Sequence, residues 1–420
     1  ATPTVKVSSP SADWRALLVC NARGGIRPIL ANAVIALRHA PEWSGVLRWD
    51  ELHARIVTAR PTPWGAQPGE VWTDQHERLL TVWLQQAGIS CALEIAGQAA
   101  QTVALEHPFH PVRDYLKSLR WDGTPRLRQW LTTYLGTPPN AYTEAVGQCF
   151  MIGAVARILQ PGCKQDTILV LEGPQGIGKS SAIRILFDPW YCDHLPELGS
   201  KDSFLQLHGS WCIELAELDA LNRAEVSRIK AFLSSQVDKF RLPYGRRPVE
   251  RPRQTVFVGT TNRDDWNRDE TGARRYWPVR CAGIDLDALA RDRDQLWAEA
   301  VALYDAGARW WFSEAESAVI EQAAEEQAAR YDSDPWEPLI SSWLKSPQSR
   351  PSGDGTLPPM ISNAEMVTLD DLLWHCLGKP PETWTQGDKN RVARCLRAMG
   401  WQRVQMRVDG QRRWFYRRSS

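Results

Sequence analysis

The sequence has no long hydrophobic run, no paired cysteines and almost no net charge. No apolar stretch approaches the ~18 residues that a membrane span requires, so no membrane partner is expected. The first residues lack the apolar core and cleavage site of a secretory signal, and the nine scattered cysteines include no C-x-x-C pair. These absences argue against a membrane protein, a disulfide scaffold and a zinc site. They favour a cytoplasmic protein with reduced thiols.

What is present is the composition of a soluble globular protein. Apolar residues make up 43% of the chain and charged residues 24%. A chain of 420 residues exceeds one ordinary core, so roughly two to four folded units are expected.

The formal net charge of +1 hides charge that is segregated along the chain. Residues 283–337 carry 14 acidic residues against 4 arginines, a balance of −10. Residues 361–420 carry 11 basic residues against 6 acidic ones, and residues 239–253 carry 6 against 1, a balance of +5 in each case. Basic segments at defined places in a neutral chain favour a polyanionic partner. Solvated surface arginines are the alternative for any one segment.

Helix-breaking residues divide the chain into five segments. Residues 1–105 predict a mainly helical domain, with helical spacing in ILANAVIALRHA and in DQHERLLTVWLQQAG, and residues 106–165 predict a helical segment leading into the next unit. Residues 166–330 predict an α/β domain, residues 331–361 a linker rich in Pro and Gly, and residues 362–420 a small independent domain.

The stretch LEGPQGIGKSS has the spacing of a phosphate-binding loop, G-x-x-x-x-G-K-S. It follows an apolar run, DTILVLEG, and precedes a predicted helix, KSSAIRILF, which is the strand–loop–helix context that such a loop requires. Lys179 would reach the terminal phosphates of ATP, and the Ser180 hydroxyl would hold Mg²⁺. The predicted nucleotide-binding residues are Gly173, Pro174, Gln175, Gly176, Ile177, Gly178, Lys179, Ser180 and Ser181.

A phosphate loop alone leaves kinases, GTPases and motors open, and an acidic strand narrows the choice. SWCIELAELDAL is an apolar strand that ends in acids, where a carboxylate could hold Mg²⁺ and polarise water. Glu217 is the first choice for this carboxylate and Glu214 the second. The alternative for each is a solvated acid on an edge strand.

Two later segments supply groups that could act on the γ-phosphate. TVFVGTTN ends in Asn262, an amide at a strand tip that could orient the attacking water or contact the phosphate. DETGARRYWPV offers Arg274 and Arg275, either of which could stabilise the charge that spreads over a neighbouring subunit's phosphoryl group during transfer.

In this order, the motifs resemble the virulence-associated protein E family. The resemblance covers about residues 106–300 and includes WDGTPRL, PGCKQDTILVLEGPQGIGKSS, ELAELDAL, GTTN and TGARRYWPV. It implies a primase-helicase-like ATPase of phages, satellite phages and genomic islands, related to superfamily 3 helicases. The implied fold is α/β, a P-loop AAA+-type ATPase that assembles into a homo-oligomeric ring, usually a hexamer, around DNA.

The resemblance also implies roles for individual residues. Lys179 and Ser180 match the phosphate loop, Glu217 matches the catalytic acid, Asn262 the sensor and Arg275 the arginine finger. Because this strand contains two glutamates, it stays open which of Glu217 and Glu214 is the catalytic acid. No polymerase-type segment precedes the motifs, so priming is not predicted.

Superfamily 3 helicases carry a hairpin between the acidic strand and the sensor strand, with its tip in the ring's channel. The resemblance therefore suggests that the basic stretch with the Pro-Tyr-Gly turn contacts single-stranded DNA through its phosphates. An exposed loop, or arginines that pair with a neighbouring subunit's acids, is the alternative. The candidate contacts are Lys239, Arg241, Arg246, Arg247, Arg251 and Arg253.

The C-terminal segment makes a second argument for DNA. TLDDLLWHCLG and GDKNRVARCLRAMG predict two helices, and WQRVQMRVDGQRRWFYRR predicts two strands joined at Asp409-Gly410. Two helices and a hairpin resemble a winged helix, which could bind duplex DNA or dock a protein. The candidate DNA contacts are Arg391, Arg394 and Arg397 on the second helix and Arg412 and Arg413 on the hairpin.

Together these features predict an ATP-driven DNA helicase or DNA-remodelling motor that acts in replication of a mobile element. It would hydrolyse ATP at the subunit interfaces of the ring. Three alternatives stay open. The first is a ring ATPase that loads or melts DNA at an origin without processive unwinding, and the second is a DNA-bound regulator whose nucleotide switches its assembly. The third is a small-molecule P-loop kinase, which the basic tail and the tandem Arg274-Arg275 disfavour.

Overall fold

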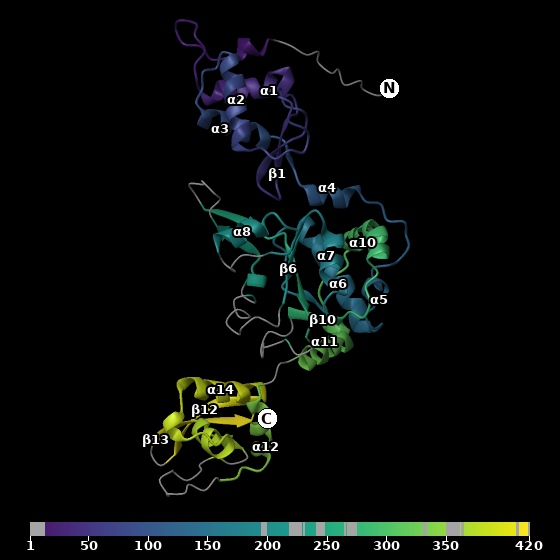
Figure 1. The fold of residues 1–420 in the computed structure, drawn as a ribbon, viewed down its shortest axis with the longest axis vertical. Helices are drawn as coiled ribbons and strands as arrows, with labels where there is room; N and C mark the ends of the chain where they lie inside the picture. The colour runs from purple at the N-terminus through teal and green to yellow at the C-terminus, as the bar shows by residue number, and fades with distance from the viewer. Residues whose placement is uncertain are drawn as a thin grey trace. The chain divides into compact units, whose positions relative to one another are not determined.

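The computed structural model divides into two units, Ala1–Asp264 with Arg274–Glu326 and Asp265–Ala273 with Gln327–Ser420 (Figure 1). Each unit is described by itself. The structure describes residues 13–194, 200–217, 229, 232–240, 248–263, 266, 275–330, 334–349, 362, 365–408 and 411–418.

The first unit begins with a region that has its own hydrophobic core. Ala33 and Ala36 on α1 and all four alanines of α3 are fully buried, and their short side chains let the two helices pack closely. Helices α1 and α2 confirm the two helices predicted from spacing. The four-residue strands β1 and β2 were not predicted, because so short a run carries too little alternation to recognise. The elements are α1 (Leu30–His39), β1 (Leu47–Asp50), β2 (Arg55–Thr58), α2 (Asp74–Gln86), α3 (Leu93–Leu105) and β3 (Pro108–Phe109), with sheet order β2-β1-β3.

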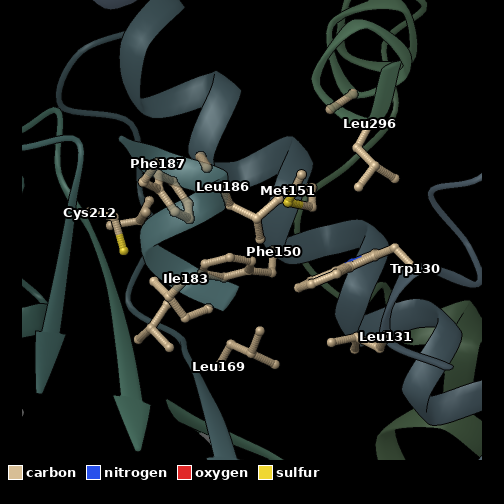
Figure 2. Close-up of a cluster of buried hydrophobic side chains, with 14 of the residues drawn as sticks. Trp130, Leu131, Phe150, Met151, Leu169, Ile183, Leu186, Phe187, Cys212 and Leu296 are labelled. Atoms are coloured by element: carbon tan, nitrogen blue, oxygen red, sulfur yellow. The ribbon is translucent and has the colours of Figure 1, made fainter. Parts of the chain in front are cut away.

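Three helices, α4 (Pro111–Ser118), α5 (Trp130–Leu135) and α6 (Ala141–Leu159), lead from this region to the central sheet. Helix α6 is apolar around most of its circumference, and most of its residues are buried, as expected of a helix in the middle of a domain. Its side chains meet those of α5, α7, α10 and the sheet in one core (Figure 2).

The central sheet has five strands in the order β10-β4-β9-β6-β5, and all of its pairs are parallel. Every residue of β4 and β9 is buried, which is typical of parallel strands that are covered on both faces. Helices α7 and α10 pack against each other and against α6 in the same core. The elements are β4 (Ile168–Glu172), α7 (Lys179–Phe187), β5 (Tyr191–Cys192), β6 (Cys212–Leu215), β9 (Val256–Thr261), β10 (Tyr276–Arg280) and α10 (Leu286–Asp305).

The topology of this sheet places a crevice at the end of β4. The chain leaves β4 for β5 at the far edge, returns through β6 and β9, and then passes to β10 on the other side of β4. In an open parallel sheet, ligands bind outside the carboxyl ends of strands where the strand order reverses in this way. The loop after β4 and the residues after β9 lie at this point.

An antiparallel ribbon of β7 (Val237–Phe240) and β8 (Val249–Pro252) lies between β6 and β9 in the chain. The unit also contains α8 (Lys201–Leu207) and α11 (Ser317–Ala329). None of the helices in the described ranges is both long enough and apolar enough to cross a membrane.

The second unit contains three strands in the order β11-β13-β12, with antiparallel pairs, and helices around a small core. The prediction of a linker over residues 331–361 is wrong in part, because α12 lies within this range. Ile340 of α12 is 0% exposed in the core of this unit. Trp336, Ile340, Trp343 and Leu344 have helical spacing, which the surrounding prolines and glycines obscured. The elements are α12 (Trp336–Lys345), β11 (Met366–Val367), α13 (Leu369–Asp371), the π-helical turn η6 (Leu372–Cys376), α14 (Gln386–Ala398), β12 (Trp401–Val408) and β13 (Gln411–Arg418).

Candidate functional site

The loop between β4 and α7 has a backbone that only glycine adopts readily at three positions. Gly173, Gly176 and Gly178 have φ angles of 146°, 82° and 100°. A Cβ on Gly173 would lie 2.8 Å from the carbonyl oxygen of Cys281, so no side chain fits there. Gly178 is the N-cap of α7, and the free N–H groups of a helix N-terminus attract anions. The loop borders a pocket of about 310 Å³.

Lys179 lies in this pocket and links the loop to the neighbouring strand. Its side chain is buried, with the residue 7% exposed, and burial lowers the pKa of its amine. The amine donates hydrogen bonds to the carbonyl oxygens of Gly173 (2.6 Å) and Pro174 (2.9 Å) and to Oδ1 of Asn262 (3.0 Å). Two predicted site residues, separated by more than eighty positions, are thus in direct contact. A phosphate group would offer the amine a stronger partner than these neutral oxygens.

Glu214 lies on β6 directly behind the pocket and is 2% exposed. Its Oε1 accepts hydrogen bonds from Oγ of Ser180 (2.7 Å) and Oγ1 of Thr260 (2.6 Å). Its Oε2 accepts one from the hydroxyl of Tyr191. The carboxylate therefore faces the hydroxyl predicted to hold Mg²⁺, but Ser180 and Thr260 separate it from the pocket that they line.

Glu217 occupies a different position, two residues beyond the end of β6. It is exposed and lines the pocket. Its φ angle is +53°, a left-handed conformation that is uncommon outside glycine and that costs about 1–3 kcal/mol. Strained backbone of this kind is concentrated at functional sites, where the surrounding structure maintains it. The two candidate acids are thus separated into a buried one behind Ser180 and a solvent-facing one at the pocket.

The oxygen groups at this site suit Mg²⁺, which prefers hard oxygen ligands and keeps several waters or phosphate oxygens in its shell. Within the described residues, no group of three or more His, Cys, Asp and Glu side chains could hold a metal ion. An ion at Ser180 would therefore depend on nucleotide phosphates and water to complete its shell, as Mg²⁺ commonly does.

The contacts of Tyr191 and Thr260 with Glu214 were not predicted from the sequence. Strand β5 is only two residues long, so no periodic signal marked Tyr191 as part of the sheet. Thr260 stands in the predicted strand TVFVGTTN, but only its terminal Asn262 was considered. The polar residue two positions before a strand tip was the signal available for Thr260.

Arg275 lies at the amino ends of the parallel strands, whereas the pocket lies at their carboxyl ends. It directly precedes β10, whose first residue, Tyr276, is in register with Ile168 at the start of β4. Its guanidinium donates to Oγ of Ser234 (3.2 Å), and its Nε lies 4.0 Å from Oδ2 of Asp166. Within one chain, Arg275 is therefore separated from the phosphate loop by the length of β4. Arg274 lies outside the described residues.

The basic ribbon contains one incorrect prediction. Arg253 was predicted to contact DNA, but it is 0% exposed. Its guanidinium pairs with the carboxylate of Asp238 at 2.5 Å and 3.0 Å, and it also donates to the carbonyl oxygen of Phe232, whose ring lies 4.5 Å from the guanidinium carbon. Burial lowers the pKa of the neighbouring His208 to about 4, so the cation that neutralises Asp238 is Arg253. Arg253 anchors the base of the ribbon.

The other ribbon residues differ in their surroundings. Lys239 is exposed and pairs with Glu250 at 2.8 Å across the ribbon. Arg251 is half-buried, and burial lowers the pKa of its guanidinium. Arg241, Arg246 and Arg247 lie outside the described residues.

In the second unit, one of the predicted DNA contacts is used inside the fold. Arg391 donates to both oxygens of Asp334 at 2.7–2.9 Å, and its guanidinium carbon lies 4.0 Å from the centroid of the Trp336 ring. These contacts join α14 to α12, so Arg391 already has an acidic partner within this unit. Among the other candidates, Arg397 and Arg412 are exposed, and Arg394 and Arg413 are half-buried.

Comparison with known proteins identifies the family of this chain. The model of the virulence-associated protein E-like domain matches residues 116–330, which is just over half of the chain. No curated protein matches the sequence. The apo structure of the NrS-1 C terminal region is similar with a TM-score of 0.47 and 11% identity, over 88% of this chain and 95% of that one. The A form apo structure of that region gives a TM-score of 0.40 and 13% identity, over 72% and 78%. At these values the structural likenesses carry no functional argument.

Proposed function

Because this chain belongs to the virulence-associated protein E-like family, we propose that it is a P-loop ATPase of the AAA+ type that acts on DNA as a helicase or remodelling motor. Its substrate would be ATP with Mg²⁺, and its biological setting the replication of a mobile element. The action on DNA and the biological setting come from the family resemblance. The ATPase activity is inferred from the geometry of the pocket.

The observation that carries the proposal is the arrangement of four polar side chains around the glycine loop. Lys179 contacts Asn262 at 3.0 Å, and Ser180 contacts Glu214 at 2.7 Å, all at the carboxyl edge of adjacent parallel strands. A cation, a hydroxyl and an amide would then face the phosphates of a nucleotide whose charge the loop amides and the α7 N-terminus stabilise.

Each residue has a distinct proposed role in hydrolysis. Lys179 would exchange its loop carbonyls for the terminal phosphates, and this exchange would free Asn262 to contact the γ-phosphate or the attacking water. Glu217 would accept a proton from that water, because it is the candidate acid that lines the pocket. Ser180 would hold Mg²⁺, with Glu214 behind it accepting the hydroxyl proton, and the charge of the ion would neutralise the phosphate oxygens.

Arg275 would serve a neighbouring subunit rather than its own. In one chain Arg275 lies at the amino ends of the strands, away from the pocket, so a contact with nucleotide requires a second copy. A head-to-tail arrangement that closes into a ring would give every loop one such arginine. A hexamer is the ring size that the family resemblance implies.

For DNA, we propose two contacts. The ribbon of β7 and β8, which carries Lys239 and Arg251, would contact single-stranded phosphates. The second unit, with two helices and a hairpin, would act as a winged helix that binds duplex through exposed arginines such as Arg397 and Arg412. Arg253 and Arg391 are not part of either contact.

The test is ATP hydrolysis with and without single-stranded DNA, followed by strand displacement on a forked duplex. The wild-type protein should hydrolyse ATP, single-stranded DNA should accelerate it, and Lys179→Ala should abolish it. Lys117→Ala, on the exposed face of α4, is the matched control and should behave as wild type. An ATP hydrolysis rate that is the same with and without single-stranded DNA would refute a DNA motor. DNA-stimulated hydrolysis without strand displacement would restrict the function to melting or remodelling of DNA.

A further inference from the structure

Tyr191 forms the remaining hydrogen bond to the carboxylate behind the pocket. It lies on β5, the edge strand beside β6, in register with Cys212, two residues before Glu214. Its hydroxyl donates to Oε2 of Glu214. The guanidinium carbon of Arg184 lies 5.2 Å from the centroid of its ring, and Arg184 pairs with Asp193 at 2.6 Å. The tyrosine is thus held between the sheet edge and an ion pair.

The two oxygens of Glu214 have different partners. Oε1 accepts from both Ser180 and Thr260, whereas Oε2 accepts from Tyr191. The terminal torsion of a glutamate is broad, so hydrogen bonds at both ends are needed to fix the plane of the carboxylate. Burial and the hydrogen bond to Glu214 raise the pKa of Tyr191 well above its ordinary value, so the phenol remains a donor throughout the physiological range.

The orientation of Glu214 matters because it determines where Ser180 directs its lone pairs. A serine hydroxyl has one proton and two lone pairs. When the proton is donated to Oε1 of Glu214, the lone pairs are left for a ligand in the pocket. A carboxylate that rotated away would release that proton, and Ser180 would no longer present a fixed acceptor to a cation.

We propose that Tyr191 is a positioning residue that holds Glu214 toward Ser180 and thereby sets the affinity of the nucleotide site for its divalent cation. The inference rests on the proposed function, since it concerns the metal bound with the nucleotide. Tyr191 would touch neither the nucleotide nor the metal. Groups that orient metal-binding side chains in this way typically contribute about 10- to 100-fold to metal affinity or activity.

The test removes one hydroxyl. Tyr191→Phe is compared with Tyr134→Phe, whose hydroxyl also donates to a carboxylate, Asp292 at 2.9 Å, but in another part of the same unit. Three quantities are measured: ADP binding in EDTA, Mn²⁺ binding to the ADP complex by electron paramagnetic resonance, and the Mg²⁺ concentration at half-maximal hydrolysis. Thermal melts of both variants confirm folding.

Tyr191→Phe should bind ADP in EDTA as wild type does but should bind Mn²⁺ about 10-fold more weakly. Its hydrolysis should recover at high Mg²⁺, and Tyr134→Phe should show neither change. Unchanged Mn²⁺ affinity in a wild-type background that hydrolyses ATP would overturn this inference alone. If Tyr191→Phe lost as much ADP affinity in EDTA as Mn²⁺ affinity, the effect would be a general structural one and would also overturn the inference. The same holds if Tyr134→Phe lost as much Mn²⁺ affinity as Tyr191→Phe. A wild-type protein that binds no nucleotide would overturn the proposed function itself.

Discussion

Mixing two inactive variants should restore ATP hydrolysis if Arg275 acts on a neighbouring subunit's nucleotide. Arg275 directly precedes β10, and β10 runs parallel to and in register with β4, from Ile168 to Glu172. At about 3.3 Å per residue, five residues place Arg275 roughly 17 Å from the strand end where the phosphate loop begins. An arginine side chain is too short to cross that distance, so its own nucleotide is out of reach.

The size of the expected effect follows from this geometry. Arg275→Ala should lower kcat at least about 1,000-fold, as the loss of an arginine finger does, while nucleotide binding is retained. Lys179→Ala should be inactive because its loop has lost the cation. In a random equal mixture, an interface works only when an intact Lys179 meets an intact Arg275. This occurs at about one half times one half, or roughly a quarter, of the interfaces of a closed ring.

The assay combines the variants below the assembly concentration, concentrates them together and measures hydrolysis per subunit. We expect about a quarter of the wild-type rate, and fluorescent labels on the two variants verify that subunits have mixed. Arg291→Ala, an exposed arginine on α10 that pairs with Asp292, is the control and should retain full activity on its own. Mixed rings that are no more active than the separate variants would refute an arginine supplied in trans. So would a monomer that is fully active at every concentration.

Three further predictions concern single features of the structure. Glu217→Gly should be more stable than Glu217→Ala by about 1 kcal/mol in thermal melts, because glycine adopts a φ of 53° without strain, and both should bind but not hydrolyse ATP; equal stability would contradict the strain. Arg253→Met should lower the free energy of unfolding by about 3–5 kcal/mol, and adding Asp238→Leu should restore most of that stability. If Arg253→Met instead kept its stability and made DNA binding less dependent on salt, Arg253 would be a DNA contact. Truncation after Arg330 should keep basal hydrolysis and weaken duplex binding in a gel-shift assay; unchanged duplex affinity would make the second unit a protein-docking module, and lost basal hydrolysis would mean that it supports the ring.

The glycine loop and its flanking strand and helix could be predicted because their signals are local. Three glycines within six residues impose the loop backbone, and an apolar run before them and helical spacing after them specify the strand and the helix. The carboxyl ends of parallel strands meet at one edge, so Asn262 at a strand tip could also be placed near Lys179 from the sequence.

The division between the two acids could not be read from the sequence. Glu214 and Glu217 are only three positions apart, and the sequence predicts a single apolar strand that ends in acids for both. Whether the chain continues or turns after Leu215 depends on contacts that β6 makes with distant strands. The turn at Glu217 places one carboxylate at the pocket and leaves the other behind Ser180.

The fate of the basic residues was also set by distant contacts. Charge counting treats Arg253 like its neighbours, but Asp238 on β7 of the same ribbon pairs with Arg253 and holds it in the core. Arg391 and Asp334 are separated by more than fifty positions, so no local pattern could show that α12 and α14 share this pair. Local chemistry specifies a loop, a strand or a helix, because its cause lies within a few residues. The surroundings of a charged side chain depend on which distant segment supplies the opposite charge, and that is known only when the chain is folded.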